Sequence, residues 1–432
     1  MITLNEKETS IQLSEKEETQ IIIQYWIRIL KIKLGWIHEF DKLVVNYVMI
    51  FLLFVLYLFI VIINNHYLTQ ATTVFMLDTF RSSSKLLKTF SGHTDCVYSI
   101  DCFTLDCDQF ICSGSDDKTV RVWDVENNKQ IQSFNGHSSS VSCVKFSPYH
   151  CRNYRRNVIC SASHDKTIRF WDIKDNQQWK ICKEHTKGVC GIEFSQFNRG
   201  RYLCSASDDK TIRLWDIETY KSLHVFNGHE YAVWCIAFSS LQSYNNKNKN
   251  NSIGVIGGNG YTICSGSSDR TIRVWDIETT KQLIVFKGHR DAVVSVKYGS
   301  NELGINGGTN TILSGSQDNN VCLWDIRSKK QTQVFKGHRN GINIVEYSSF
   351  VMDNNDIGDS SNIICSGSSD NTIRFWDIRS NKELHVIKEN NGIHCLTFLQ
   401  LKKEKKGKCK DDRDCDISLC YCLSNGTIHT WG

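Results

Sequence analysis

The chain has 432 residues, 41% of them hydrophobic, and a formal net charge of +5. This length and hydrophobic content allow a large buried core. The net charge is too small and too dispersed to indicate a nucleic-acid partner, so we expect none.

The first forty residues predict an extension that precedes the main domain. Residues 1–20 are polar and rich in glutamate, and we expect a disordered leader or the start of a helix. Residues 21–40 place large apolar side chains and Arg28, Lys31 and Lys33 at helical spacing. This pattern predicts a basic amphipathic helix that lies on a membrane surface or on a partner.

Residues 43–63 form an uncharged apolar segment. At about 1.5 Å per helical residue the segment is long enough to cross a hydrocarbon core of about 30 Å. We interpret it as a candidate transmembrane helix, a signal anchor because it lies too far from the start for a cleaved signal peptide. The alternative is AT-rich non-coding sequence read as protein. Residues 64–84 are expected to form a linker.

The topology of such a span is open. Basic residues before the span favour a cytoplasmic N-terminus, which would place the rest of the chain outside the cytosol. Unpaired cysteines favour a reducing compartment instead. We therefore expect the C-terminal domain to be cytosolic, with a single N-terminal membrane anchor as the alternative.

The rest of the chain repeats one unit. A Trp-Asp pair that follows a Gly-His pair or its remnant recurs six times, and Trp431-Gly432 is a degraded seventh copy. The copies are Trp123-Asp124, Trp171-Asp172, Trp215-Asp216, Trp275-Asp276, Trp324-Asp325 and Trp376-Asp377. Within the unit Lys281–Ile326, apolar residues alternate in runs bounded by Gly, Asn, Asp and Ser, which predicts four short antiparallel strands. Four strands repeated radially predict a propeller.

The repeated motifs are specific. Ser-x-Ser-x-Asp and Thr-Ile-Arg-x-Trp-Asp recur in register with Gly92-His93, Gly136-His137, Gly228-His229, Gly288-His289 and Gly337-His338. Over residues 85–432 the chain resembles the WD-repeat, or beta-transducin-like, family. The resemblance implies an all-β fold, a single seven-bladed propeller of four-stranded antiparallel blades. It also implies a non-catalytic scaffold or adaptor that binds proteins or peptides.

The resemblance further implies a hydrogen-bonded network in each blade, made by a histidine, the aspartate of a turn, a serine and the tryptophan. The predicted members are His93, Ser113, Asp117 and Trp123; His137, Asp165 and Trp171; His185, Asp209 and Trp215; His229, Ser265, Asp269 and Trp275; His289, Asp318 and Trp324; and His338, Asp370 and Trp376. A buried network of this kind stabilises when every member is satisfied. We therefore expect these His and Asp residues to be structural, although they look like catalytic dyads.

Two repeats depart from the pattern. The third has Glu184 in place of the glycine and keeps its histidine. The seventh has Glu389-Asn390-Asn391 in place of Gly-His and Asn425 in place of the turn aspartate, so we expect its internal network to be absent. Residues 85–90 match the strand that follows each Trp-Asp pair and are expected to complete the last blade, which would remove exposed strand edges.

Nineteen cysteines need an explanation. Cys112, Cys160, Cys204, Cys264 and Cys365 occupy one repeat position, which indicates reduced thiols packed in the core. Cys409, Cys415, Cys420 and Cys422 are spaced too irregularly for a metal site, and we expect no metal and no cofactor.

No phosphate-binding loop, nucleophile elbow or zinc-protease motif occurs in the sequence, so we expect no enzyme. The loop that enters each first strand is expected to carry the recognition surface. We expect Tyr98, Tyr231 and Trp234 as partner-binding anchors and Arg290 and Arg339 as partners for acidic groups, since interface hot spots are rich in these residue types. The alternative for Trp234 is packing inside its blade.

Three functions remain open from the sequence. The first is a soluble scaffold, the second a propeller tethered to a membrane through residues 21–63, and the third an enzyme or the non-catalytic subunit of an enzyme complex.

Overall fold

The computed structural model describes residues 85–105, 108–239, 261–299, 311–348, 363–402 and 415–432. The leader, the amphipathic segment, the apolar segment 43–63 and the linker expected from the sequence all lie outside these residues. Within the described part of the chain, no helix is both long and apolar enough to span a membrane.

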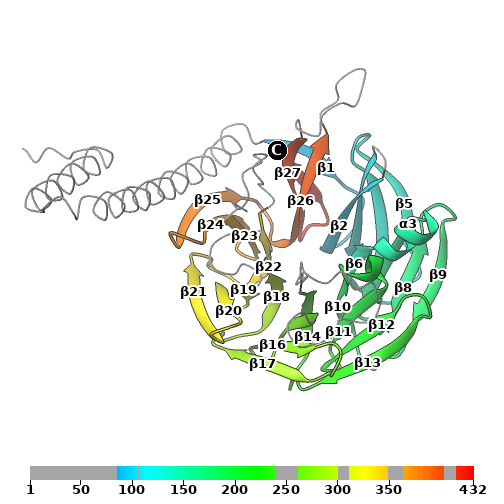
Figure 1. Cartoon of the computed structure of the whole chain (residues 1–432). Coiled ribbons are helices and arrows are strands. Elements are labelled where there is room, and N and C mark those ends of the chain that lie inside the picture. The colour runs from blue at the N-terminus through cyan, green and yellow to red at the C-terminus, as the bar shows by residue number, and fades with distance from the viewer. Residues whose placement is uncertain (1–84, 106–107, 240–260, 300–310, 349–362, 403–414) are drawn as a thin grey trace, which may run out of the picture. The chain divides into compact units, whose positions relative to one another are not determined.

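The described residues form seven antiparallel sheets of four strands, arranged radially around a central channel (Figure 1). This arrangement confirms the predicted seven-bladed propeller. Each blade is numbered by its order along the chain.

The strands of blades 1 to 3 follow one another outward from the channel. They are β2 (Val97–Leu105), β3 (Asp108–Ser115), β4 (Thr119–Asp124) and β5 (Lys129–Asn135); β6 (Val141–Phe146), β7 (Val158–Ser163), β8 (Ile168–Asp172) and β9 (Gln177–Cys182); and β10 (Val189–Phe194), β11 (Tyr202–Ser207), β12 (Thr211–Asp216) and β13 (Lys221–Asn227).

Blades 4 to 6 have the same order. Their strands are β14 (Val233–Phe238), β15 (Thr262–Ser267), β16 (Thr271–Asp276) and β17 (Gln282–Lys287); β18 (Val293–Tyr298), β19 (Thr311–Ser316), β20 (Asn320–Asp325) and β21 (Lys330–Lys336); and β22 (Ile342–Tyr347), β23 (Ile363–Ser368), β24 (Thr372–Asp377) and β25 (Lys382–Lys388).

Blade 7 is built from both ends of the repeat region. Its strands are β26 (Ile393–Lys402), β27 (Cys415–Leu423), β28 (Ile428–Trp431) and β1 (Leu86–Phe90). β1 pairs antiparallel with β28, with Phe90 opposite Ile428 and Lys88 opposite Thr430. The first strand of the propeller therefore closes the ring, and Phe90 is buried against Trp123 of blade 1 with ring centroids 5.9 Å apart.

The core lies between neighbouring blades. In one cluster Cys112, Val120 and Phe134 of blade 1 pack against Val144 and Trp171 of blade 2. The five cysteines of the repeat position, Cys112, Cys160, Cys204, Cys264 and Cys365, are all 0% exposed in such clusters, as expected for thiols that act as small apolar groups. Since each sheet is covered on both faces, every blade depends on its neighbours for burial.

Two short helical elements were not predicted. The connection between β6 and β7 contains helix α3 (Pro148–Tyr154), and the connection between β10 and β11 contains the 3-10 turn η2 (Asn198–Gly200). The connections between the first and second strands of blades 4 to 7 fall at 240–260, 300–310, 349–362 and 403–414, which lie outside the described residues.

Candidate interaction surface

Six blades contain the same four-residue network. The histidine Nδ1 lies 2.7 to 2.9 Å from the aspartate Oδ2, its Nε2 lies 2.7 to 2.8 Å from the serine Oγ, and the tryptophan Nε1 donates to the same Oγ at 2.8 Å. The six sets are His93, Asp117, Ser113 and Trp123; His137, Asp165, Ser161 and Trp171; His185, Asp209, Ser205 and Trp215; His229, Asp269, Ser265 and Trp275; His289, Asp318, Ser314 and Trp324; and His338, Asp370, Ser366 and Trp376. In each of these six blades, the histidine, aspartate, serine and tryptophan of the repeat motif are thus joined by hydrogen bonds.

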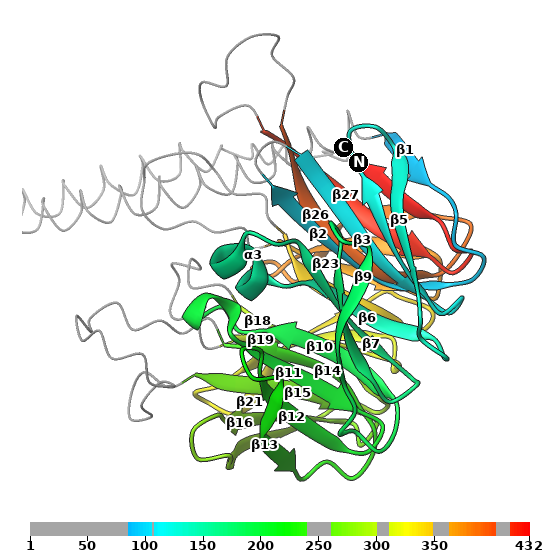
Figure 2. The same ribbon diagram turned by 90° about the vertical axis from the view of Figure 1, so that its right-hand side faces the viewer.

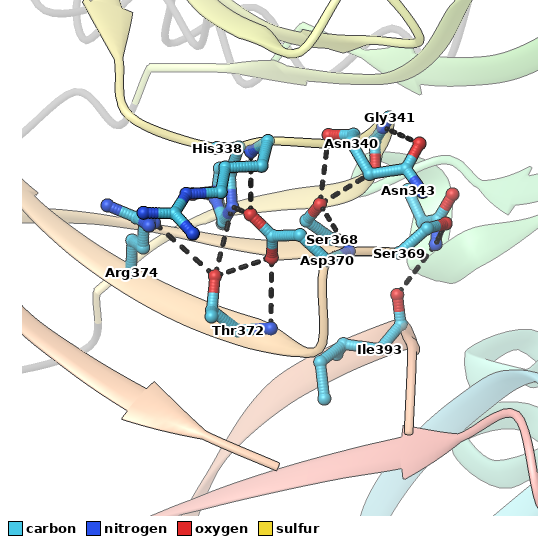
Figure 3. Close-up of polar contacts among 12 residues, drawn as sticks. His338, Asn340, Gly341, Asn343, Ser368, Ser369, Asp370, Thr372, Arg374 and Ile393 are labelled. Carbon is cyan, nitrogen blue, oxygen red and sulfur yellow. Dashed lines mark hydrogen bonds and ion pairs between the residues drawn. The ribbon is translucent and has the colours of Figure 1, made fainter. Parts of the chain in front are cut away.

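The donors and acceptors fix the tautomer of each histidine. An indole N–H can only donate, so the serine Oγ accepts from the tryptophan and its own hydroxyl proton is left for the histidine Nε2. The histidine Nδ1 then carries the ring proton and donates it to the aspartate. Figure 3 shows the His338–Asp370 pair of blade 6, where Asp370 also accepts from the backbone N–H of Thr372 at 3.0 Å.

The aspartates are held ionised. Burial by itself would raise the pKa of Asp269, but hydrogen bonds from His229 and Thr271 outweigh it and hold that pKa well below its ordinary value. The same balance lowers the pKa of Asp318 to about 2. Burial lowers the pKa of His229, although its bond to Asp269 acts in the opposite direction. The pair is therefore a neutral imidazole on a carboxylate, with both ring nitrogens already engaged.

Blade 3 keeps its network without the usual glycine. His185 lies 2.8 Å from Asp209 and 2.7 Å from Ser205. Glu184, in the glycine position, accepts a hydrogen bond of 2.8 Å from the Nη1 of Arg213. The carboxylate turns outward to the arginine, which explains why the substitution leaves the histidine in place.

Blade 7 lacks the His–Asp–Ser–Trp network among its described residues, and a different hydrogen bond stands in its place. Tyr421 stands opposite Leu396 as Ser366 stands opposite Val345, and its hydroxyl donates to Glu389. Asn425 accepts from the backbone N–H and the hydroxyl of Thr427, at 3.1 and 2.7 Å.

The replacement in blade 7 satisfies fewer groups than the network of the other blades. Among the described residues, the Nε1 of Trp431, the Oγ of Ser418, the Nδ1 of His429 and the Oγ1 of Thr430 have no hydrogen-bond partner. Blade 7 therefore keeps one hydrogen bond between its first loop and its second strand, but in the described part of the chain it leaves more buried polar atoms unbonded than the other blades do.

Paired charges line the interior of the channel. Lys145 of blade 2 lies 3.2 Å from Glu193 of blade 3 and 3.8 Å from Asp101 of blade 1. Lys297 of blade 5 lies 2.7 Å from Glu346 of blade 6. These ion pairs tie the innermost strands of successive blades together, so the charges inside the channel are used within the fold.

The channel opens on the face of the His-containing loops into a cavity of about 430 Å³, which we call the channel mouth. Its lining residues are Tyr98, Ser142, His164, Cys190, Trp234, Ser268, Ala292, Val294, Gln317, Asn343 and His394. They come from all seven blades. The mouth is therefore a composite surface in which each repeat contributes a different side chain.

Two aromatic side chains stand on different sides of the channel mouth. Trp234 is 36% exposed, and its Nε1 donates to Ser268 at 2.7 Å, so the alternative that it packs inside its blade is wrong. Tyr98 donates to Asp116 at 3.4 Å and meets His394 edge to face at 5.5 Å. Burial, followed by the charge of Asp116, raises the pKa of Tyr98 to about 12, so the phenol stays neutral.

The structure separates the five predicted anchors into two groups. Tyr98 and Trp234 line the channel mouth, whereas Tyr231, Arg290 and Arg339 are exposed and are not part of its lining. Tyr231 is 59% exposed and lies beneath the ammonium group of Lys210 at 5.6 Å.

Sequence reasoning missed His164, Cys190 and Asn343, which line the channel mouth. Alignment of the repeats could have identified these residues. Cys190 and Asn343 hold the position of Tyr98 and Trp234 in the first strands of their blades, and His164 follows the second strand as Asp116 does.

The family model described as WD domain, G-beta repeat matches residues 84–124, 128–172, 176–216, 220–276, 280–325 and 329–377, more than half of the chain. These matches correspond to six of the seven repeats. The degraded last repeat is not among them.

Curated relatives match shorter segments. The chain is 41% identical over 64 residues to the WD repeat-containing protein WDS homolog of Arabidopsis thaliana, which is 15% of this chain and 12% of the relative. It is 42% identical over 62 residues to the U3 small nucleolar RNA-associated protein 15 homolog of Xenopus tropicalis, 14% of this chain and 12% of the relative. It is 49% identical over 45 residues to the transcription initiation factor TFIID subunit 5 of Caenorhabditis elegans, 10% of this chain and 7% of the relative. The matched segments thus span about a tenth of these relatives.

Proposed function

We propose that this chain, which belongs to the WD40-repeat family of β-propellers, is a non-catalytic platform that binds protein or peptide partners at its channel mouth. WD40 propellers act as scaffolds for protein interactions. Two of the matched relatives are named as an RNA-associated protein and as a subunit of a transcription factor, which fits a role in assemblies.

The state of the His–Asp pairs supports a non-catalytic role. The side chain of His229 is 1% exposed, and its two ring nitrogens are engaged by Asp269 and Ser265. A general base must reach the proton that it removes. Since neither ring nitrogen faces a substrate, we assign these pairs to stability.

The observation that carries the proposal is the partly exposed Trp234 at a mouth lined by all seven blades. Its hydrogen bond to Ser268 restrains the indole while about a third of the residue stays exposed. Fixed aromatic side chains are frequent hot spots because they bury a large area at a small entropic cost. Trp234 is therefore the anchor we expect a partner to cover.

The test is quantitative affinity purification of the full chain from its native cell. We expect Trp234→Ala to remove a defined set of partners that Leu283→Ala keeps, because Leu283 is 47% exposed on the outer strand β17, away from the mouth. Both variants should melt within a few degrees of the unchanged protein. Identical partner lists for the two variants would refute a role for the channel mouth.

A second candidate function, a platform tethered to a membrane, is favoured by the uncharged segment 43–63. Pelleting with membranes in alkaline carbonate, compared between the full chain and a chain that begins at residue 84, tests it. Release of the full chain into the supernatant would remove this candidate and leave the binding role of the propeller unaffected.

A further inference from the structure

α3 and η2 lie on the propeller face opposite the channel mouth. Both elements connect a first strand to a second strand, and antiparallel strands place this connection at the end away from the His-containing loops. Figure 2 shows α3 projecting from the ends of the strands of its blade. We call α3, η2 and the adjoining residues Arg156, Trp179 and Arg201 the blade 2–3 platform.

The blade 2–3 platform is rigid because its two connections interlock. Gly200 has a φ of +81° and lies so close to α3 that a Cβ there would come within 2.6 Å of the Cγ of Pro148. Beneath them the ring of His150 lies 2.7 Å from the Oγ of Ser147 and 2.9 Å from the hydroxyl of Tyr220 in blade 3. These contacts hold two blades to one another and fix the backbone of α3.

Two aromatic side chains are exposed on this rigid base. Tyr154 is 55% exposed and Trp179 is 39% exposed, and both rings pack on His150, with centroids 6.3 and 5.3 Å away. Trp179 occupies the bulge of the outer strand, the position that Ile131 holds in blade 1. Blade 2 differs in the size of this residue and in the guanidinium of Arg156, which lies 5.2 Å from the centre of the indole ring.

The arginines of the platform fall into two classes. Arg156 is paired with Asp172 and Asp175, and Arg201 with Asp216 and Glu218, at 2.7 to 2.9 Å. By contrast, Arg152, Arg155 and Arg199 are exposed and form no ion pair with any residue that the structure describes. Arg199 reaches the Oδ1 of Asn153 on α3 at 3.4 Å, which places it beside the other two.

We propose that the blade 2–3 platform is a second binding site, which takes an acidic protein segment with an apolar side chain. The carboxylates of the segment pair with Arg152, Arg155 and Arg199, and its apolar side chain covers Tyr154 and Trp179. Arginine suits this role because its planar guanidinium binds a carboxylate through two parallel hydrogen bonds. Tryptophan, tyrosine and arginine are also the residue types that dominate binding hot spots.

The surroundings favour a protein segment over a nucleic acid. The four carboxylates that pair with Arg156 and Arg201 lie beside the available arginines and interrupt the positive surface. A nucleic-acid backbone carries a continuous row of charges and needs an uninterrupted basic stripe. An acidic peptide, by contrast, needs only a few arginines placed to pair with its carboxylates.

The test uses the full chain and a short fluorescein-labelled peptide of glutamates around one central phenylalanine, followed by fluorescence anisotropy. We expect this peptide to bind, and its glutamine counterpart to bind at least about tenfold more weakly. Charge reversal at all three available arginines, Arg152→Glu, Arg155→Glu and Arg199→Glu, should weaken binding of the glutamate peptide about tenfold or more.

The matched control reverses Lys129, Lys281 and Lys330 to glutamate, because these exposed lysines lie at or beside the start of the outer strands of blades 1, 4 and 5. The affinity of this control for the glutamate peptide should stay within about twofold of that of the unchanged protein. Equal losses in the arginine and lysine variants would reduce the effect to net charge and overturn the proposal. Equal affinities for the glutamate and glutamine peptides would also overturn the proposal.

A second pair of variants tests the aromatic part of the site. Trp179→Ala should weaken binding of the glutamate peptide. Ile131→Ala at the same bulge of blade 1, and Trp234→Ala at the channel mouth, should leave the affinity for this peptide unchanged. Thermal melts of each variant confirm that the fold persists. Tighter binding of a single-stranded oligonucleotide through the same three arginines would replace the proposal with a nucleic-acid site.

Discussion

At the residue scale, the aspartate of each His–Asp pair accepts several hydrogen bonds at once. Each aspartate accepts from a buried imidazole, from a backbone N–H beside that histidine, and from the turn that it caps. In blade 4 these donors are His229 at 2.7 Å, the N–H of Glu230 at 3.1 Å and the N–H of Thr271 at 3.0 Å. Removing one carboxylate therefore leaves several donors without an acceptor.

We predict that Asp269→Ala lowers the free energy of unfolding by about 1 to 3 kcal/mol, the cost of unsatisfied buried donors. Asp291→Ala is the control, because Asp291 is exposed and, among the described residues, its carboxylate accepts only from the adjacent N–H of Ala292. Urea and thermal melts of both variants measure the difference. Equal melting points would mean that the blade 4 pair is not structural.

The buried histidines of these pairs, together with His150, predict how stability depends on pH. Burial lowers the pKa of His93, His137, His229 and His338, and it lowers that of His150 to about 4. An unfolded histidine takes up its proton at about pH 6.5, whereas these folded ones do so at lower pH. Unfolding therefore takes up protons below about pH 6.5, and stability falls as the pH drops.

We expect a lower free energy of unfolding at about pH 5 than at about pH 7.5, measured by urea titration at each pH. Still lower pH should remove the further contribution of the aspartates, since their folded pKa values lie below the unfolded value of about 3.9. His338→Gln should reduce the difference in the free energy of unfolding between about pH 7.5 and about pH 5. A flat profile for the unchanged protein would contradict the assignment of neutral, buried imidazoles.

At the scale of the element, blade 7 is the least regular sheet. It replaces the four-residue network with a single bond from Tyr421 to Glu389, and it leaves the Nε1 of Trp431 and the Oγ of Ser418 without hydrogen-bond partners among the described residues. Burial, followed by the hydrogen bond to Glu389, raises the pKa of Tyr421, so its hydroxyl remains a donor. This bond links the loop before β26 to the second strand of the blade.

We predict that Tyr421→Phe destabilises the propeller by about 1 kcal/mol, the typical net value of one hydrogen bond. Tyr202→Phe is a matched control, because Tyr202 is buried in blade 3 and its hydroxyl makes no hydrogen bond with the described residues. Urea unfolding of the two variants gives the comparison. A Tyr421→Phe variant as stable as the control would show that blade 7 depends on packing alone.

At the scale of the whole molecule, the propeller depends on one strand from the other end of the repeat region. β1 pairs with β28, and Phe90 joins a cluster that includes Trp123 of blade 1 and Cys420 and Ile428 of blade 7. The ring is thus closed both by strand pairing and by burial between its first and last blades. An unclosed ring would expose a strand edge that invites association.

We predict that Phe90→Ala costs about 3 to 5 kcal/mol, as for other fully buried phenylalanines, and increases aggregation on heating. Leu87→Ala on the same strand is the control, since Leu87 is 38% exposed at a bulge and should have little effect. Thermal melts with light scattering measure both outcomes. If the two variants behaved alike, closure by β1 would not limit the stability of the ring.

The sequence by itself was sufficient for the fold, because every repeat carries its own copy of the signal. Strand periodicity, the Gly-His and Trp-Asp pairs and the orphan strand at 85–90 predicted seven blades and their closure. The His–Asp–Ser–Trp sets could be predicted because their members recur at the same positions of the repeat.

The tertiary structure alone decided where side chains from different repeats meet. The channel mouth gathers single residues from seven blades, and no local pattern shows that Trp234 and His394 border one cavity. The blade 2–3 platform likewise depends on Gly200 approaching Pro148 across two blades. The replacement of serine by Tyr421 became visible only through strand register. Repetition specifies contacts within a blade, whereas recognition depends on the residues that differ between blades and on the distances between them.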